Sequence, residues 1–328
     1  MVEKTDKYIF IWDVAENGSA VLYRMYSKKP VAVLPEAVGD KKIEMIAPYC
    51  FASNRKLTDT DVCDEIDKMY GNYHEFAGDY IENISLPDTL KKIGNNAFYN
   101  CRNMSLLEMG TDIDEVGSDV FMNCRSFRRM TVRGSSQSDS GVSQMLSRYS
   151  SELEVCFECN GQTEAKLLYP EYFESYDEIS PAHIFGRNIE GEGFRARQCF
   201  DNGKIVFSQY DSVFSKASAE ESVTVASRMA VDRLMYPVGL DTCFKNEYQE
   251  YVRKNQGEIM EIMVRNRSID ELEYMCSSKI ADSKELDHAM TLASQEGWHE
   301  GTACMIEWKH KYDIKEKDRY DFSSIEFL

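Results

Sequence analysis

The sequence contains no long hydrophobic run and a deficit of basic residues, and each shortage excludes a class of protein. No stretch approaches the roughly 20 apolar residues of a membrane-spanning helix, and the N-terminal apolar patch at 8–12 is too short for a signal peptide. The 38 basic residues against 56 acidic ones give a formal charge of −18. Because this field repels phosphate groups, we expect neither nucleic acid nor a membrane as partner. A basic protein or peptide is compatible with the charge.

The ten cysteines form neither a disulfide framework nor a zinc-binding set. Cys156 and Cys159 make a lone C-x-x-C pair, and no second pair follows at zinc spacing. The alternating pattern around them predicts a strand, which places the two thiols on opposite faces. We therefore expect reduced thiols in a cytoplasmic protein, with no metal and no other cofactor.

An internal repeat is the strongest positive signal in the sequence. ISLPDTLKKIGNNAFYNCRN begins at Ile84, and LLEMGTDIDEVGSDVFMNCRS begins at Leu107. Eight positions recur as the same or a similar residue at a spacing of 23 residues, among them an identical Asn-Cys-Arg that starts at Asn100 and again at Asn123. A single unit of this kind cannot bury its apolar face, so stacking of neighbouring units is expected.

These units resemble the BspA-type leucine-rich repeats that are common in gut bacteria and some protists. The unit that begins at Ile84 matches the pattern throughout, and the unit that begins at Leu107 has Gly110 in place of proline. An earlier unit is expected over 31–51, with Ala47 where the family has glycine, and Met130 is expected to begin the strand of a final, truncated unit. The resemblance covers about 8–134 and implies a β-solenoid. The other matching residues are as follows: Val31, Val33, Leu34, Pro35, Val38, Gly39, Ile43, Ile46 and Phe51 in the unit over 31–51; Leu86, Pro87, Ile93, Gly94, Ala97, Phe98 and Cys101 in the unit that begins at Ile84; and Met109, Val116, Gly117, Val120, Phe121 and Cys124 in the unit that begins at Leu107.

An acidic insertion at 52–82 separates the first two units. Insertions in a solenoid map to loops, which often lie on a functional face, so Asp61, Asp64 and Glu65 are candidate partner-binding residues. A solvated loop and a degenerate repeat are the alternatives. The spacing of a calcium-binding EF-hand is absent.

The patterns predict an α+β chain: a short leucine-rich-repeat β-solenoid, a small middle β module and a helical, ankyrin-like C-terminal domain. Asn17-Gly18 is expected to be the turn of an N-terminal β-hairpin that caps the repeats. The segment 1–134 holds this hairpin and the repeats, 135–150 is a polar linker, 151–215 is rich in β-strands, and 216–328 is helical.

Within these parts, strands are expected at 153–159, 166–169, 182–185, 194–200 and 204–207, and turns at 160–161 and 202–203. Helices are expected at 220–235, 244–266, 268–276, 284–295 and 298–312. The segment 287–312 resembles an ankyrin helix–turn–helix, with Gly297 at its turn.

Two arginines form a local basic spot in the β module. Arg195 and Arg197 follow Gly191-Glu-Gly193, which could suggest a phosphate-binding turn, but their alternation with apolar residues favours a strand of a hairpin. They are candidate contact residues for a partner.

We expect a non-catalytic protein–protein interaction scaffold or adaptor of the bacterial cytoplasm, and we expect no enzyme. The candidate exposed positions on its strand surface are Ser85, Glu108 and Thr131. One rival is an enzyme with its site in the β module; another is a surface adhesin, as some members of the repeat family are. The residues considered for the enzyme are Tyr169, His183, Arg195 and Arg197.

Overall fold

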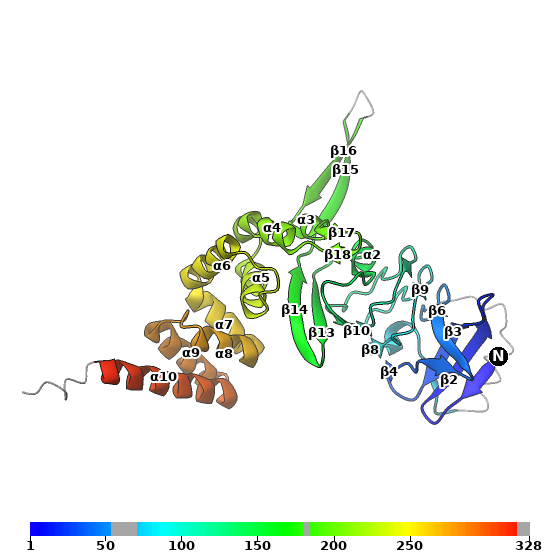
Figure 1. Cartoon of the computed structure of the whole chain (residues 1–328), viewed down its shortest axis with the longest axis horizontal. Coiled ribbons are helices and arrows are strands. Elements are labelled where there is room, and N and C mark those ends of the chain that lie inside the picture. Colours follow the sequence, from blue (N-terminus) through cyan, green and yellow to red (C-terminus); the bar gives the residue numbers. More distant parts are fainter. Residues whose placement is uncertain (54–70, 180–183, 320–328) are drawn as a thin grey trace, which may run out of the picture. The chain divides into compact units, whose positions relative to one another are not determined.

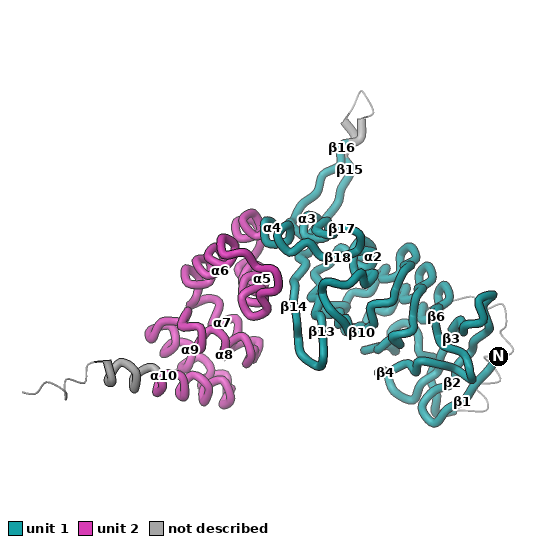
Figure 2. Tube along the Cα trace, viewed as in Figure 1, with its two compact units in different colours: residues 1–213 teal, residues 214–328 magenta. Residues whose placement is uncertain are grey.

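The computed structural model describes residues 1–53, 71–179 and 184–319, and it divides into two compact units (Figure 2). The first unit covers Met1–Val213, and the second covers Phe214–Leu328. All described strands belong to the first unit, whereas the second is helical (Figure 1). The predicted α+β class, with a repeat solenoid followed by helices, is confirmed.

The solenoid is built on a sheet with one parallel strand from each coil (Figure 1). Ile84, Leu107 and Met130 are register partners in three adjacent strands, so the 23-residue repeat returns the chain to the same level in each coil. The strand β14 adds antiparallel at one end of the sheet, and β4 is the other end. In sheet order the strands are β4 (Val31–Val33), β8 (Asn83–Ser85), β10 (Leu106–Met109), β12 (Arg129–Arg133), β13 (Leu153–Cys159) and β14 (Gln162–Tyr169).

A second sheet runs along the coils and begins with the N-terminal hairpin. Its strands β2 and β3 pair antiparallel around Asn17-Gly18, and Gly18 has a φ of +82°, which confirms the predicted turn. Because β3 pairs with β6, the hairpin caps the first coil, as expected. The strands are β1 (Val2–Lys4), β2 (Tyr8–Val14), β3 (Ala20–Ser27), β6 (Lys41–Ile46), β9 (Lys92–Ile93) and β11 (Glu115–Val116), with β5 (Ala37–Val38) on β6 and β7 (His74–Glu75) on β3; the 3-10 turn η1 (Gly78–Tyr80) follows β7.

Buried aromatic and thiol groups join each coil to the next. Phe98 stacks between Phe51 and Phe121, with ring centroids 5.0 and 5.8 Å away. The thiol of Cys101 donates a hydrogen bond to the carbonyl of Phe51 (3.2 Å), and the thiol of Cys124 donates to the carbonyl of Phe98 (3.1 Å). The repeated phenylalanine and cysteine therefore form one continuous core.

The asparagines of the two identical Asn-Cys-Arg segments, and the arginine of the first, also have structural roles. Asn100 and Asn123 have φ values of +62° and +65°, a left-handed conformation that asparagine tolerates better than most residues. The amide of Asn123 also donates to that of Asn100 (2.8 Å). Arg102 pairs with Asp79 (Nε–Oδ1 2.9 Å), and its hydrogen bonds lower the pKa of that carboxyl.

Gly94 and Gly117 are required because successive coils approach closely. A Cβ on Gly94 would lie 2.4 Å from the nitrogen of Pro48, and one on Gly117 would lie 2.5 Å from that of Asn95. Neither glycine has a positive φ, so the close contact between coils, and not the backbone conformation, requires glycine here. Ala47 takes the equivalent position in the first coil, where the neighbour is the N-terminal hairpin instead of another coil.

The solenoid has one coil more than the sequence predicted. Met130 does not begin a truncated final unit, because β13 pairs parallel with β12 over five residues. The segment 135–150, expected to be a linker, contains the short helix α2 (Val142–Leu146), whose apolar residues Val142 and Leu146 are buried. The first strand of the expected β module (151–215) is therefore part of the solenoid sheet.

Small elements follow β14 in the first unit. The strands β15 (Phe173–Ile179) and β16 (Ile184–Glu190) form a hairpin, and β17 (Phe200–Asp201) and β18 (Lys204–Ile205) form a second one. Asn202-Gly203 is the turn of the second, as predicted. A strand over 194–200 was wrong: the first part of that segment is the helix α3 (Gly193–Ala196).

Seven helices are described from residue 207 onward. The predicted single helix over 244–266 was wrong, because it breaks at Asn255 (φ −108°, ψ 13°). Both the backbone N–H (3.1 Å) and the side-chain amide (2.9 Å) of Asn255 donate to the carbonyl of Tyr251. The helices are α4 (Phe207–Glu220), α5 (Val223–Met235), α6 (Thr242–Lys254), α7 (Gln256–Asn266), α8 (Ile269–Ser277), α9 (Ser283–Gln295) and α10 (His299–Arg319).

The described residues contain neither a membrane-spanning helix nor a cluster of metal ligands. None of the helices found there combines the length and the apolar character that a bilayer crossing requires. Within 1–53, 71–179 and 184–319, no three His, Cys, Asp or Glu side chains gather in a way that could hold a metal ion.

Candidate functional site

The outer face of the solenoid sheet brings three predicted residues together. Ser85, Glu108 and Thr131 are register partners in β8, β10 and β12, so they form one row across the coils. Their exposure differs from the prediction, because Ser85 and Thr131 are each only 7 % exposed, while Glu108 is half-buried. Thr131 stands in mid-sheet between Glu108 and Cys156, and Ser85 lies under the side chain of Arg133.

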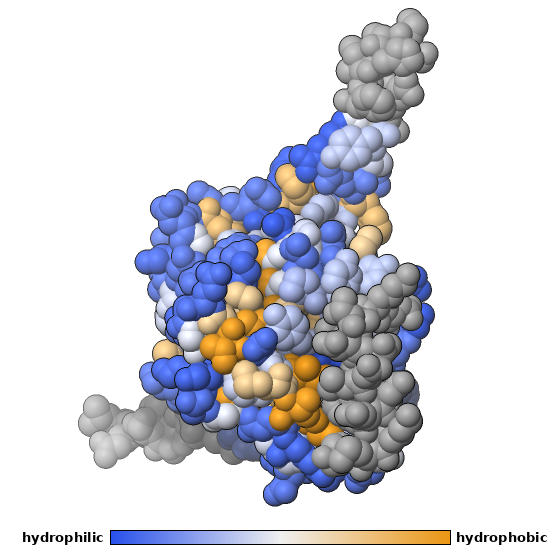
Figure 3. All heavy atoms as spheres, turned by 90° about the vertical axis from the view of Figure 1, so that its right-hand side faces the viewer, coloured by the Kyte–Doolittle hydropathy of each residue, from blue (hydrophilic) through white to orange (hydrophobic). Residues whose placement is uncertain are grey.

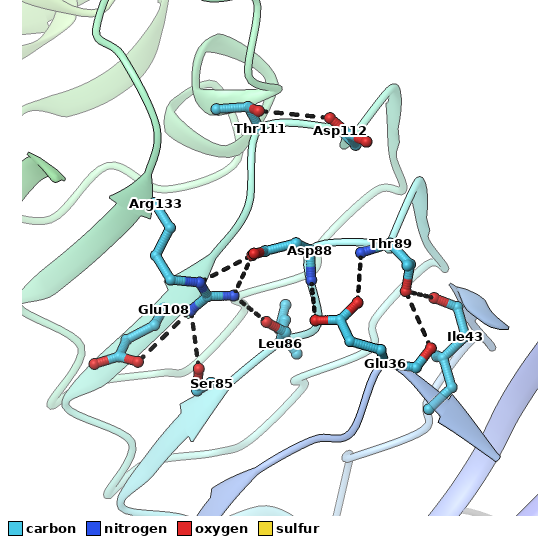
Figure 4. A network of polar contacts seen from close by, with 10 residues as sticks. All are labelled: Glu36, Ile43, Ser85, Leu86, Asp88, Thr89, Glu108, Thr111, Asp112 and Arg133. Atoms are coloured by element: carbon cyan, nitrogen blue, oxygen red, sulfur yellow. Dashed lines mark hydrogen bonds and ion pairs between the residues drawn. The ribbon is translucent and has the colours of Figure 1, made fainter. Parts of the chain in front are cut away.

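Arg133, at the end of β12, reaches across β10 to β8 (Figure 4). Its guanidinium donates to the hydroxyl of Ser85 (2.9 Å) and to the carboxylate of Asp88 (Nε–Oδ1 2.9 Å), and it also donates to the carbonyl of Leu86. The carboxylate of Glu108 lies 3.7 Å from the same group. A planar fork with five donors suits this set of acceptors, so Arg133 is a fixed cation on the face.

The first coil holds the acceptor side of this network in place (Figure 4). The carboxylate of Glu36 accepts from the backbone N–H groups of Asp88 and Thr89 (both 3.1 Å), and the hydroxyl of Thr89 donates to the carbonyl of Ile43 (2.9 Å). Gly110 replaces the family's proline for a steric reason, since its Cβ would lie 2.9 Å from the Cα of Asp88. The turn that carries Asp88 is thus fixed from two coils.

A second outward row carries a three-membered ionic group. Arg129, Glu154 and the backbone of Leu168 are register partners in β12, β13 and β14. The carboxylate of Glu154 lies 2.7 Å from Arg129 Nε and 3.4 Å from Lys166 Nζ, and this glutamate side chain is only 5 % exposed. Arg129 itself is exposed, so a positive charge with a buried counter-charge stands on this part of the face.

The β4 end of the same face is apolar. Val33 is 64 % exposed and Val31 is 43 % exposed, whereas Ala32 between them is buried. Ala32 is the register partner of Ile84 and takes the inward position. The hydroxyl of Tyr8 accepts from the N–H of Val33 (3.0 Å) and occupies one backbone donor of this end strand. Figure 3 shows hydrophobic side chains gathered on this end of the first unit.

The two arginines predicted as a basic contact spot have different environments. Arg195 is exposed and lies 3.7 Å from Glu192. Arg197 is buried, and its guanidinium donates to the carbonyls of Tyr149, Pro170, Gly193 and Ser151 at 2.6–2.9 Å. Arg197 therefore does not form part of a surface patch, because it binds backbone groups inside the fold.

Two of the residues considered for an enzyme site, Tyr169 and Arg197, are buried. Tyr169 is fully buried, and burial lowers the pKa of Arg197 to about 10, which keeps it charged at neutral pH. His183 and the acidic candidates of the insertion lie outside the described residues; the latter are Asp61, Asp64 and Glu65.

Sequence reasoning missed Arg129, Arg133 and Glu154. A signal for the two arginines was present, because both are two residues from Thr131 and therefore on the same side of its strand. No comparable signal pointed to Glu154, since the sequence predicted β13 as part of a separate module.

Residues 70–160 match the family described as BspA type Leucine rich repeat region (6 copies). The matched segment contains the coils from β8 to β13 whose stacked phenylalanines and 23-residue register are described above. Residues 70–160 are a BspA-type leucine-rich repeat region. This repeat region extends beyond residue 134, where the sequence resemblance ended, and so includes the additional coil.

Two solved structures resemble part of the chain. A leucine rich cell surface protein from Faecalibacterium prausnitzii A2-165 is 18 % identical, with a TM-score of 0.27 over 40 % of this chain and 30 % of that one. A leucine rich repeat protein from T. pallidum is 16 % identical, with a TM-score of 0.22 over 37 % of this chain and 68 % of that one. The chain thus spans less than a third of the first structure's length. No curated protein matches the chain.

Proposed function

We propose that this chain is a non-catalytic protein–protein interaction scaffold or adaptor of the bacterial cytoplasm. The observation that carries the proposal is the outer face of the solenoid sheet, defined here as the outward residues of β4, β8, β10, β12 and β13. It combines exposed valines at one end with fixed, partly exposed arginines along the rest.

The arginine side chains of this face are preorganised for binding. Arg129 is held by Glu154 of the adjacent strand and Arg133 by Asp88 of the turn after β8, so little side-chain entropy remains to be lost when a partner binds. Arginine is also among the residues that most often contribute strongly to binding energy at protein interfaces. A partner of this face would place apolar groups on Val31 and Val33 and acceptor groups at the arginines.

The helical unit is proposed to supply a second binding surface made of ankyrin-like helix pairs. In support, α7 packs on α9 and α8 packs on α10, as the two helices of successive ankyrin repeats do. The tight turns between paired helices have left-handed residues, Arg267 (φ +54°) and Gly297 (φ +65°). The second helices of the two pairs, α8 and α10, begin at Ile269 and His299, 30 residues apart, against an ankyrin period of about 33.

The cytoplasmic location is supported by the thiols of the solenoid core. Cys101 and Cys124 act as hydrogen-bond donors to carbonyls, a role that only the reduced form can fill. A reducing compartment preserves this state. Fractionation of cells that express the full-length gene product distinguishes this location from the cell surface, because surface-accessible protein would be lost on protease treatment of whole cells.

Capture of partners on the full chain, followed by calorimetric titration of the purified partner, tests the function. Val31→Glu and Val33→Glu should weaken binding at least about tenfold, because each buries a charge against the partner. Val14→Glu is the matched control, since Val14 and Val31 are both 43 % exposed. Equal binding by all three variants, or failure of the chain to hold any protein, would contradict the proposal.

A further inference from the structure

The hairpin of β15 and β16, called the arm from here on, carries exposed aromatic residues on both of its faces. Within the described residues neither strand pairs with any strand except the other (Figure 1). Phe173 and Tyr176 are each 64 % exposed, and their separation of three residues places them on opposite faces. An isolated two-stranded hairpin is only marginally stable in water. A third strand on the open edge of the arm, or a partner on its open faces, would stabilise it.

The base of the arm is firmly attached to the first unit. Phe194 of α3 packs edge-on against Tyr172 (5.5 Å between centroids), and the guanidinium of Arg187 lies 4.9 Å from the ring of Phe194. A Cβ on Gly193 would lie 1.9 Å from the carbonyl oxygen of Pro170, which shows how closely the two segments approach. The arm therefore leaves a fixed base, which lowers the entropy lost when a partner docks.

Acidic residues outnumber basic ones in the arm and the segment that leads into it. No lysine or arginine occurs between Lys166 and Arg187, whereas that interval contains four carboxylates, on Glu171, Glu174, Asp177 and Glu178. Arg187 is already engaged, because its Nε lies 2.5 Å and its Nη2 3.1 Å from the carboxylate oxygens of Glu174. A second copy of this chain is a poor partner, since two acidic arms on chains of charge −18 repel each other.

We propose that the arm docks an extended, lysine- or arginine-containing strand of another protein along the open edge of β15. Backbone hydrogen bonds to that edge supply affinity by strand addition. The excess of acidic residues between Lys166 and Arg187 favours basic residues in the added strand, and Phe173 and Tyr176 cover its aliphatic parts. The inference rests on the proposed interaction role but uses a surface other than the solenoid face.

A blocked ten-residue peptide of alternating lysine and valine is the probe, and fluorescence anisotropy with the full chain is the measurement. Phe173 and Glu190 are register partners, so replacing 174–189 by Asn-Gly shortens the arm to a tight turn. The replacement removes Arg187 but leaves the contact between Tyr172 and Phe194 at the base. This trimmed chain should bind the probe at least about tenfold more weakly, and added salt should weaken binding to the unmodified chain.

Two further comparisons make the result specific. The double variant Phe173→Ser, Tyr176→Ser should also lose affinity, whereas Val2→Ser, Val14→Ser, which changes exposed residues of β1 and β2, should not. A peptide with glutamate in place of lysine should not bind. Unchanged binding by the trimmed chain, or equal binding of both peptides, overturns the proposal, and the solenoid-face variants still report separately on the proposed function.

Discussion

Arg197 illustrates how a residue that looks like surface charge in the sequence can be structural. Its guanidinium binds four backbone carbonyls and is 5 % exposed. Arg197→Lys keeps the charge but loses the planar fork, so carbonyls are left without donors, and we expect a loss of about 2–4 kcal/mol in unfolding free energy. Denaturant unfolding of the first unit measures it. Arg195→Lys, on an exposed side chain, should change stability by less than about 0.5 kcal/mol, and an equal loss in both variants would contradict this account.

Gly94 tests the close approach of the coils. Gly94→Ala adds a Cβ 2.4 Å from the backbone of Pro48, so the coils must separate, at a cost of about 1–3 kcal/mol. Gly71→Ala is the matched control, because a Cβ there meets nothing within 4 Å. Calorimetry of both variants should show a lower Tm for Gly94→Ala alone. If the two have the same Tm, backbone contact is not the reason for the glycine.

At the scale of elements, the sequence was informative where one residue type has one physical role. Gly94 and Asn-Cys-Arg helped to predict β8 and β10, because both features recur in these two coils 23 residues apart. The sequence did not show that β13 belongs to the solenoid. The segment before β13 looked like a linker, since its helix α2 carries only a few apolar residues among many serines. Exposure on the solenoid face was not predictable either, because the burial of Ser85 depends on Arg133, 48 residues away.

The contact between Gly301, in the first turn of α10, and Trp298, just before this helix, offers a test of the helical unit. A Cβ on Gly301 would lie 2.3 Å from the ring of Trp298, which is buried. Gly301→Val should therefore displace the indole and lower the Tm of the helical unit, by an amount equivalent to about 1–3 kcal/mol. Calorimetry should show the first unit unchanged, since the affected residues lie in the second. A shared fall in both transitions would mean that the units do not unfold separately.

At the scale of the molecule, two architectures share one chain. The BspA-type repeat region presents an array of strands with fixed side chains, and the helical unit presents packed helices. Recurring patterns predicted both architectures, but the positions that would distinguish one partner from another lie in single residues such as Val33, Arg129 and Arg133, which follow no repeat.

The most direct test of the account is photo-crosslinking from the solenoid face in living cells. A benzoylphenylalanine in place of Val33 lies on this face, and one in place of Met122, which is 50 % exposed, lies on a turn outside the strands. We expect a discrete protein adduct from Val33 and none from Met122. An adduct from Met122 alone, or none from either position, would contradict the assignment of the solenoid face as the binding surface.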